Sequence, residues 1–182
     1  MKLSIIIPVF NEQNTILQIL EKINMVDFIQ KEIIIVDDCS SDKTINLLKN
    51  LSKQEYKIFY HNINLGKGAA IQTGKKFVTG DIVVIQDADL EYDPNEFPIL
   101  MEPILSGKAD AVFGSRMINK NGAIRGGMPL YKFIGNKILT YYQNKLFNKN
   151  FTEFHSGYRI YRVNSLKKIP YELNNNDHSF DN

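Results

Sequence analysis

Cysteine, tryptophan and long apolar runs are what this chain of 182 residues most plainly lacks. Its single cysteine, Cys39, excludes an internal disulfide, and one cysteine with three histidines gives no spacing typical of a zinc site. A formal net charge of +2, without an arginine-rich run among aromatics, argues against a nucleic-acid partner. The apolar runs are too short for a membrane span or a signal peptide. This composition favours a globular protein in a reducing compartment.

What remains is sufficient for one folded domain, because 43% of the residues are hydrophobic and 23% are charged. Short, continuous, β-branched runs alternate with stretches of helical periodicity. We expect strands over 3–10, 32–38, 57–61, 81–86 and 109–115, and helices over 16–23, 45–51, 66–77, 94–107 and 129–147. Asn11 and Asn14 would cap the first helix, Pro98 and Pro103 would interrupt the fourth, and the last would be amphipathic. This order predicts a doubly wound, mostly parallel α/β sheet flanked by helices, with ligands outside the carboxyl ends of the strands.

A dense cluster of negative charge follows the fourth expected strand, where Asp87, Asp89, Glu91 and Asp93 occupy alternate positions. Such carboxylates repel one another, so a positive group is expected among them. In an extended segment Asp87 and Asp89 project to the same side, where two hard oxygen ligands can share a divalent cation. A solvated turn is the alternative, and helix capping is the expected role of Asp93, which precedes a proline. The pattern predicts a Mg²⁺ or Mn²⁺ ion that carries a diphosphate.

Several motifs follow one another in an informative order. They are "IIIPVFNE", "IIIVDDCSSDKT", "NLGKGAAIQTG", "VVIQDADLEYDP", "GSR" and "HSGYRIYR". Together they resemble the family 2 glycosyltransferases of the GT-A fold, a Rossmann-like α/β fold, over essentially the whole chain. Within that family the chain is most similar to the branch that contains dolichyl-phosphate mannosyltransferase and the polyprenyl-phosphate glycosyltransferases. A dinucleotide dehydrogenase is not expected, because "PVFNE" stands where its glycine fingerprint would follow the first strand.

The resemblance implies a binding site for a nucleotide-diphosphate sugar. It places the following residues at the nucleotide sugar: Pro8, Phe10, Glu12, Val36, Asp38, Lys67, Asp87, Ala88, Asp89 and Arg116. A carboxylate such as Asp38 can accept hydrogen bonds from a base or a ribose, or it can cap the second helix, for which Asp42 is the stronger candidate. Lys67 lies between two glycines and would approach a phosphate, unless the glycines form only a structural turn.

The resemblance also implies a metal site and its partner arginine. Its metal ligands would be Asp87, Asp89 and Glu91, and its cofactor Mg²⁺ or Mn²⁺. Relatives often carry glutamine at the position of Glu91, so this chain keeps an oxygen ligand there and adds a charge. Arg116 corresponds to a phosphate-binding arginine whose planar fork suits a diphosphate, with a surface ion pair as the alternative. Asp89, Arg116 and Glu153 would be the catalytic residues.

The later motifs imply an acceptor site. Lys132 and Asn136, one helical turn apart, would share a face and hold an anionic acceptor, or simply form a solvated helix face. Glu153 precedes the Ser-Gly pair where relatives commonly carry aspartate, and His155 is a further candidate. Arg159 would hold the site by an ion pair or touch a phosphate.

Three functions are open at this point. The expected one is inverting, metal-dependent sugar transfer from a donor such as GDP-mannose or UDP-glucose to a polyprenyl or dolichyl phosphate, at the cytoplasmic face of a membrane. A polysaccharide or protein hydroxyl is the alternative acceptor, and it would need a carboxylate base such as Glu153 or Asp181. A non-catalytic nucleotide-binding module is the third. We expect one catalytic domain over 1–182, truncated at its C-terminus relative to relatives, and the oligomeric state is open.

Overall fold

The computed structural model describes residues 1–27, 30–115, 117–118, 128–154 and 156–168. These residues form a six-stranded sheet in the order β3-β2-β1-β4-β6-β5. The strands are β1 (Lys2–Val9), β2 (Gln30–Asp37), β3 (Tyr56–Tyr60), β4 (Ile82–Ile85), β5 (Ala111–Phe113) and β6 (Arg159–Arg162). Strands β1 to β4 run parallel, whereas β6 runs antiparallel to both β4 and β5. The strand order reverses between β1 and β4, which is where sheets of this kind bind ligands.

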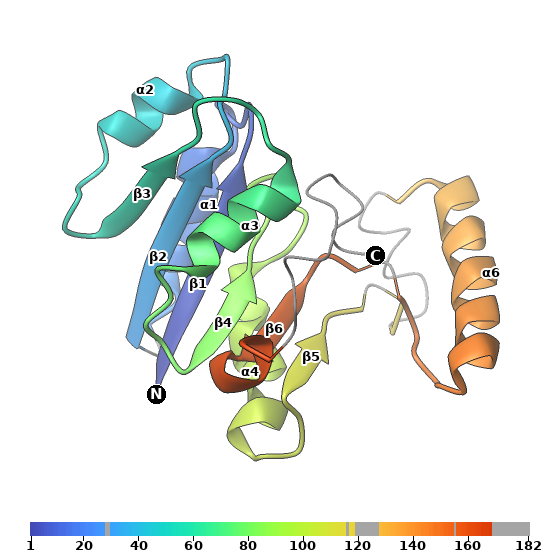
Figure 1. Ribbon diagram of the computed structural model, residues 1–182. Coiled ribbons are helices and arrows are strands. Elements are labelled where there is room, and N and C mark those ends of the chain that lie inside the picture. Colours follow the sequence, from blue (N-terminus) through green and yellow to red (C-terminus); the bar gives the residue numbers. More distant parts are fainter. Residues whose placement is uncertain (28–29, 116, 119–127, 155, 169–182) are drawn as a thin grey trace.

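Helices cover both faces of the sheet (Figure 1). They are α1 (Ile16–Met25), α2 (Thr44–Lys49), α3 (Lys67–Lys75), the 3₁₀ helix η1 (Pro94–Glu96), α4 (Phe97–Leu105), α6 (Leu130–Phe147) and α7 (Val163–Leu166). Buried side chains of α1 and α4 pack on one face, and those of α3 and α7 pack on the other. Helix α6 stands to the side, away from both layers.

The middle of each central strand is a run of apolar residues, because both faces of the sheet are covered there. Along β1, Leu3, Ile5 and Ile7 pack toward α1 and α4, while Ile6 packs toward α3 and α7. Each fully buried aliphatic side chain contributes roughly 1.5–3 kcal/mol of transfer free energy. Helix α3 approaches β1 closely at Gly74, where a Cβ atom would lie 2.7 Å from Cγ2 of Ile6. Because Gly74 has no side chain, α3 can pack closely against β1.

The predicted doubly wound, mostly parallel fold is confirmed, and the differences are local. The segment Arg159–Arg162 forms β6, which we did not predict because four residues show no clear period and their place between β4 and β5 is a tertiary property. The predicted interruption of the fourth helix is wrong. Pro98 lies in the first turn of α4, where its missing N–H has no partner to lose, and Pro103 lies inside the helix. The carbonyl that Pro103 leaves without a helical donor belongs to Ile99, whose residue is 72% exposed.

The predicted caps of the first helix are also wrong, since Thr15 occupies the N-cap position of α1 and neither Asn11 nor Asn14 does. Asn11 adopts a left-handed φ of 58°, and its Oδ1 accepts hydrogen bonds from two backbone N–H groups of the loop after β2. It thus ties the first strand-end loop to the second. Asp42 fulfils its predicted role, because its Oδ1 accepts a 2.9 Å hydrogen bond from the backbone N–H of Thr44 at the start of α2.

The last predicted helix is confirmed in extent as α6, which has 18 residues. Within the described ranges, no helix combines the length and the apolar character that a membrane span requires. Thr140 is the one residue of α6 that is buried.

Candidate functional site

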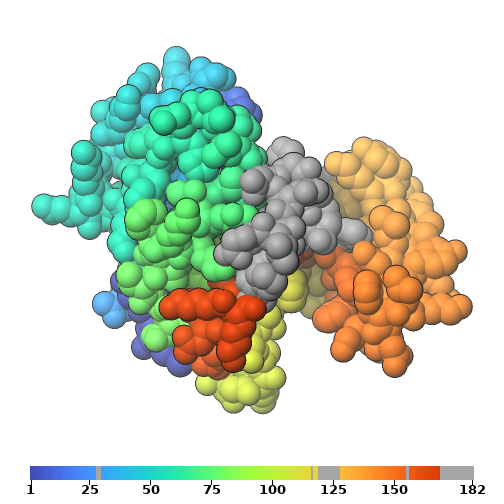
Figure 2. Space-filling model, viewed as in Figure 1, coloured from blue at the N-terminus to red at the C-terminus, as the bar shows by residue number. Residues whose placement is uncertain are grey.

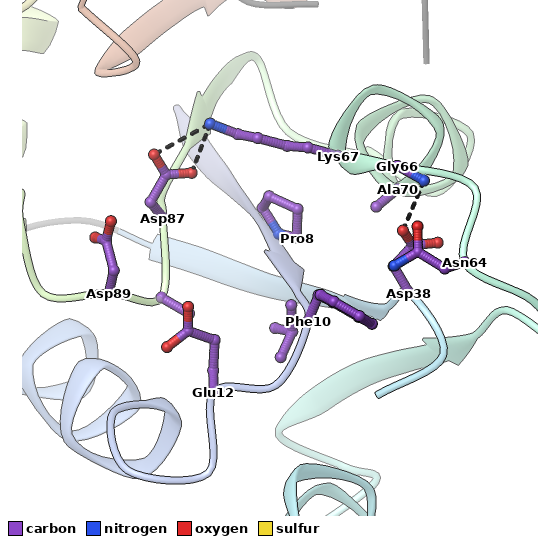
Figure 3. Close-up of a pocket in the computed structure, with 12 residues that line it drawn as sticks. Pro8, Phe10, Glu12, Asp38, Asn64, Gly66, Lys67, Ala70, Asp87 and Asp89 are labelled. Carbon is purple, nitrogen blue, oxygen red and sulfur yellow. Dashed lines mark hydrogen bonds and ion pairs between the residues drawn. The ribbon is translucent and has the colours of Figure 1, made fainter. Parts of the chain in front are cut away.

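A pocket of about 270 Å³ opens at the carboxyl ends of β1, β2 and β4, at the reversal of the strand order. It is lined by Pro8, Val9, Phe10, Glu12, Asp38, Asn64, Gly66, Lys67, Ala70, Asp87, Ala88 and Asp89 (Figure 3). All the residues predicted at the nucleotide sugar lie here except Val36 and Arg116. Val36 is buried beneath the pocket in a cluster with Ile34 and Ala70, and Arg116 lies outside the described residues.

Asp38 anchors the loop between β3 and α3. Its Oδ1 accepts a hydrogen bond from the backbone N–H of Leu65 at 2.9 Å, and its Oδ2 accepts one from Gly66 at 2.7 Å. His61 Nδ1 lies 2.7 Å from the same Oδ1, and its Nε2 lies 2.9 Å from Oγ1 of Thr73 on α3. Asp38 therefore shapes the pocket wall, rather than capping the second helix, and only 3% of the residue is exposed.

Lys67 and Asp87 form an ion pair across the pocket. The Lys67 Nζ lies 2.9 Å from Oδ1 and 3.1 Å from Oδ2 of Asp87, so the ammonium contacts both carboxylate oxygens. Lys67 is the first residue of α3, and Gly66, with a φ of 91°, turns the backbone into that helix. Part of the positive charge expected among the carboxylates is thus supplied by the protein itself.

The carboxylate-bearing loop after β4 is held in shape by its own side chains. It turns at Ala88 and Asp89 instead of staying extended, and Leu90 takes a left-handed φ of 67°. The Oδ1 of Asp89 accepts a 3.0 Å hydrogen bond from the backbone N–H of Glu91, which stabilises the turn. The buried Gln86 closes the loop, since its Nε2 donates to the carbonyl oxygens of Asp87 at 3.1 Å and of Tyr92 at 3.2 Å.

Asp93 ends this loop as predicted, because its carboxylate caps η1 by accepting a 3.1 Å hydrogen bond from the backbone N–H of Asn95. Its backbone carbonyl also accepts a 2.9 Å hydrogen bond from the hydroxyl of Tyr158. Burial raises the pKa of the Tyr158 hydroxyl well above its ordinary value, and the negative charges of Glu96 and Asp93 raise it further. Tyr158 therefore stays protonated and remains a hydrogen-bond donor at neutral pH.

The donor set of the pocket suits a hard divalent cation bound together with a ligand. Asp87 and Asp89 both line it, and oxygen ligands are those that Mg²⁺ and Mn²⁺ prefer. Over the described ranges, no three or more aspartate, glutamate, histidine or cysteine side chains converge as a metal cluster. Two carboxylates are nevertheless an ordinary protein contribution, because these ions usually complete their shell with water and substrate phosphates. The assignment of Glu91, which is exposed, stays a prediction.

Two of the residues predicted on the acceptor side meet directly. The Nδ2 of Asn136 on α6 donates a 2.9 Å hydrogen bond to Oε1 of Glu153, and Oγ1 of Thr140 donates to Oδ1 of Asn136 at 3.1 Å. Glu153 is only 4% exposed. Lys132 is exposed one turn away on α6. Asn136 thus fixes the orientation of the buried Glu153 carboxylate.

Arg159 begins β6 and packs against its neighbours in the sheet. Its guanidinium lies 5.3 Å from the centre of the Phe113 ring, and its Nε donates a 2.9 Å hydrogen bond to the carbonyl of Ser156. Arg159 pairs with Ile85, two residues before Asp87, so it lies near the carboxyl end of β4. His155 and Asp181, the other predicted acceptor-side residues, lie outside the described residues.

Sequence reasoning missed a close contact between the two sides of the site. A Cβ atom at Gly157 would lie 3.2 Å from Oδ2 of Asp87 and 3.7 Å from Nζ of Lys67. The backbone N–H of Gly157 donates a 3.0 Å hydrogen bond to the hydroxyl of Tyr92, whose ring stacks on that of Tyr158 at 4.7 Å. The resemblance places the "HSGYR" motif on the acceptor side, yet its glycine packs directly against the ion pair of the pocket.

Sequence reasoning also missed Asn64, which lines the pocket, and His61, which contacts Asp38 in the pocket wall. A signal for His61 was present, because it directly follows the third strand, at the sheet edge where the other site residues gather. No comparable signal marks Asn64, since its place depends on the path of the loop that Asp38 holds.

Comparison with protein-family models finds a match to "Glycosyl transferase family 2" over residues 4–170. Among curated proteins, the chain is 31% identical to the UDP-N-acetylglucosamine–dolichyl-phosphate N-acetylglucosaminyltransferase of Methanococcus voltae, over 93% of this chain and 72% of that protein. It is 35% identical to the dolichol-phosphate mannosyltransferase of Pyrococcus furiosus, over 72% of this chain and 37% of that protein. The chain spans only part of the length of many relatives that it matches. For three of them, including the Pyrococcus protein, that share lies between 37% and 66%.

Solved structures agree on the fold. Glucosyl-3-phosphoglycerate synthase from Mycobacterium tuberculosis, in complex with Mn²⁺, UDP and glucosyl-3-phosphoglycerate, matches with a TM-score of 0.68 at 22% identity. The match covers 93% of this chain and 59% of the mycobacterial chain. At this identity the likeness establishes the shared GT-A architecture.

Proposed function

The chain belongs to glycosyl transferase family 2, and we propose on this premise that it transfers a sugar from a nucleotide-diphosphate sugar to a polyprenyl or dolichyl phosphate. The observation that carries the proposal is the charge of the pocket: of the described residues that line it, Glu12, Asp38, Asp87 and Asp89 are acidic and Lys67 alone is basic. Such a pocket repels a free diphosphate but attracts a diphosphate complexed with a divalent cation. This balance of charge supports metal-dependent binding of a nucleotide diphosphate.

On the donor side, each pocket residue has a physical role. The ring of Phe10, 47% exposed at the pocket, offers an apolar surface for a base or ribose. Asp87 and Asp89 would hold the cation, which when bound stabilises the negative charge of the departing nucleoside diphosphate. Lys67, the first residue of α3, would direct its ammonium toward the same phosphates, and the N-terminus of that helix would favour their negative charge. Arg116 remains the predicted second cationic partner of the diphosphate.

On the acceptor side, the names of the Methanococcus and Pyrococcus relatives favour a lipid phosphate. A phosphate monoester is ionised near neutral pH, so its oxygen can attack the anomeric carbon without a protein base. The new carbon–oxygen bond forms on the face opposite the breaking bond to the diphosphate, which inverts the configuration. Lys132, Asn136 and Arg159 are the residues that would position this anion. Glu153, which accepts a hydrogen bond from Asn136, would hold the residues around the acceptor in place and would not accept a proton from it.

Calorimetric titration of UDP and of GDP, each with and without Mn²⁺, tests the donor half of this proposal. We expect one nucleotide to bind in the presence of Mn²⁺, and we expect Asp89→Ala to abolish that binding. Asp93→Ala is the matched control, because Asp93 caps η1 and lies outside the pocket lining. If neither nucleotide bound the intact chain, the proposed donor site would be wrong. The chain would then be a member of the family without this activity.

Transfer of a radiolabelled sugar to short-chain polyprenyl phosphate tests the acceptor half. The same assay with a polyprenol that lacks the phosphate distinguishes an anionic acceptor from a hydroxyl acceptor. Equal transfer to both would overturn the lipid-phosphate assignment while leaving the donor site intact.

A further inference from the structure

The Asp38 carboxylate is almost fully occupied by hydrogen bonds from the protein itself. Among the described residues, three donors reach it: the backbone N–H of Leu65 and Nδ1 of His61 contact Oδ1, and the backbone N–H of Gly66 contacts Oδ2. An ionised carboxylate has about four acceptor positions, two on each oxygen. Within the described part of the chain, one position on Oδ2 therefore remains open, on a side chain that lines the pocket and is 4% exposed.

His61 occupies the second acceptor position of Oδ1. Its Nδ1 must donate the hydrogen bond, because an ionised carboxylate can only accept. On the other side of the ring, Nε2 lies 2.9 Å from Oγ1 of Thr73 on α3. Figure 2 shows α3 on the outer surface of the molecule, and the His61 side chain, which contacts it, is only 10% exposed. Contacts at both ring nitrogens fix the imidazole, and the imidazole together with the two backbone N–H groups fixes the plane of the Asp38 carboxylate.

Asp38 lies at the end of the pocket that would receive a nucleobase. Figure 3 shows Asp38 at one end of the pocket and Asp87 and Asp89 at the other. The cation and the diphosphate would occupy the end with the two carboxylates, so the base would lie at the opposite end, against the exposed ring of Phe10. Asn64 also lines this end, and its amide can donate to a carbonyl of the base. The one open position on Asp38 would then meet an edge of the base.

We propose that His61 makes this pocket selective for a uracil nucleotide over a guanine nucleotide. Uracil presents a single N–H donor, at N3, between two carbonyl groups, so one open acceptor position satisfies it. Guanine presents adjacent donors at N1 and N2, which need two acceptor positions of a carboxylate. The second donor would be buried without a partner, which weakens binding by roughly tenfold. His61 is a positioning residue, because it contacts Asp38 and not the base. The inference rests on the proposed function and names its donor nucleotide.

Calorimetric titration of the intact chain in the presence of Mn²⁺ tests the selectivity. We expect UDP to bind at least about tenfold more tightly than GDP. The matched probe is the diphosphate of 3-methyluridine, which keeps the ring, the ribose and the diphosphate but carries a methyl group in place of the N3–H. It should bind at least about tenfold more weakly than UDP, because Asp38 receives no donor from it.

Two substitutions of His61 test its positioning role. In His61→Asn, the conservative variant, the amide N–H takes the place of Nδ1–H and can still donate to Asp38. In His61→Gln, the amide reaches toward Thr73 instead, so Asp38 regains an acceptor position and its carboxylate can turn. We expect the ratio of UDP affinity to GDP affinity to fall by at least about fivefold in His61→Gln and to be retained in His61→Asn. The ratio compares two ligands on one protein, so a smaller folded fraction does not change it.

The outcomes that overturn the inference differ from those that overturn the proposed function. If GDP binds as tightly as UDP, or 3-methyluridine diphosphate binds as tightly as UDP, the selectivity is wrong while the donor site stands. If His61→Gln preserves the affinity ratio, His61 supports only the fold and does not set the selectivity. If neither UDP nor GDP binds with Mn²⁺, the donor site itself is wrong and the inference falls with it.

Discussion

The ammonium of Lys67 contacts both carboxylate oxygens of Asp87 inside the pocket, with Nζ at 2.9 Å from Oδ1 and 3.1 Å from Oδ2. Asp87 is also one of the two carboxylates that would hold a divalent cation. Lysine and metal ion therefore compete for the same oxygens, and metal binding should turn Lys67 toward the diphosphate. In the absence of ligand, this ion pair offsets the repulsion between Asp87 and Asp89.

Replacing the lysine should separate these two effects. In Lys67→Met, Mn²⁺ alone should bind more tightly, because its competitor at Asp87 is gone. The nucleotide diphosphate with Mn²⁺ should bind about tenfold more weakly, since an ion pair to phosphate is lost. Electron paramagnetic resonance of free Mn²⁺ measures the first effect and calorimetry the second. Lys76→Met, at the exposed C-terminal end of α3, is the control and should change neither the Mn²⁺ affinity nor the nucleotide affinity. If Lys67→Met bound Mn²⁺ with unchanged affinity, lysine and metal ion would not compete for Asp87.

The contact of Gly157 with the ion pair predicts a steric effect on the site. In Gly157→Ala, the new methyl group would lie 3.2 Å from Oδ2 of Asp87, so the carboxylate must shift by a few tenths of an ångström. We expect nucleotide binding with Mn²⁺ to weaken about fivefold, with little change in thermal stability. Gly135→Ala, where no atom lies within 4 Å of the new Cβ, should leave binding unchanged and stabilise α6 slightly. Wild-type affinity in the Gly157 variant would show that the carboxylate has room to move.

The role of Glu153 predicts how turnover responds to losing its charge. A glutamine can still accept the hydrogen bond from Asn136 but cannot act as a base. With a polyprenyl phosphate acceptor, Glu153→Gln should keep transfer within about tenfold of the wild type, because the acceptor is already ionised. Asp89→Ala should abolish transfer. Collapse of turnover in Glu153→Gln, with nucleotide binding intact, would instead identify Glu153 as a base and a hydroxyl as the acceptor.

A buried carboxylate at the opposite end of the sheet predicts the acid sensitivity of the fold. Glu32 Oε2 lies 2.7 Å from Nζ of Lys2 and 3.0 Å from Nζ of Lys57, and Oε1 accepts hydrogen bonds from Ser4 and from the backbone N–H of Thr79. Burial alone would raise the pKa of Glu32, but the hydrogen bonds from Lys2, Ser4 and Thr79 outweigh it and hold the pKa well below its ordinary value. The stabilisation is therefore complete above the ordinary glutamate pKa of about 4.3 and is lost as the pH falls below it.

Urea unfolding of the wild type and of Glu32→Gln between neutral pH and acid measures this effect. At pH 7 the variant should be less stable by about 1–3 kcal/mol, because two ammonium groups lose their charged partner. The difference should shrink as the pH falls below about 4, where the wild-type carboxylate begins to lose its advantage. A difference that stays constant with pH would contradict the assigned role of Glu32.

Much of this protein can be read from local sequence. The strands are continuous β-branched runs because both faces of the sheet are covered, and the helices between them repeat their apolar residues with helical spacing, so the alternation and the fold class follow. The position of the site follows as well, since polar residues after β1, β2 and β4 must gather where the parallel strands end. These features depend on short continuous runs and on a helical period of about four residues, both of which neighbouring positions reveal.

The tertiary structure alone decided which residues far apart in the chain contact one another. Asp38 holds Leu65 and Gly66, Lys67 pairs with Asp87, and Gly157 packs against that pair, because the sheet brings the loops together. The antiparallel insertion of β6 between β4 and β5 is of the same kind, and so is the exposure of apolar residues of α6 such as Leu130 and Leu146. Periodicity shows that a helix has an apolar side, but which side contacts the protein depends on the hydrogen bonds and packing available to each.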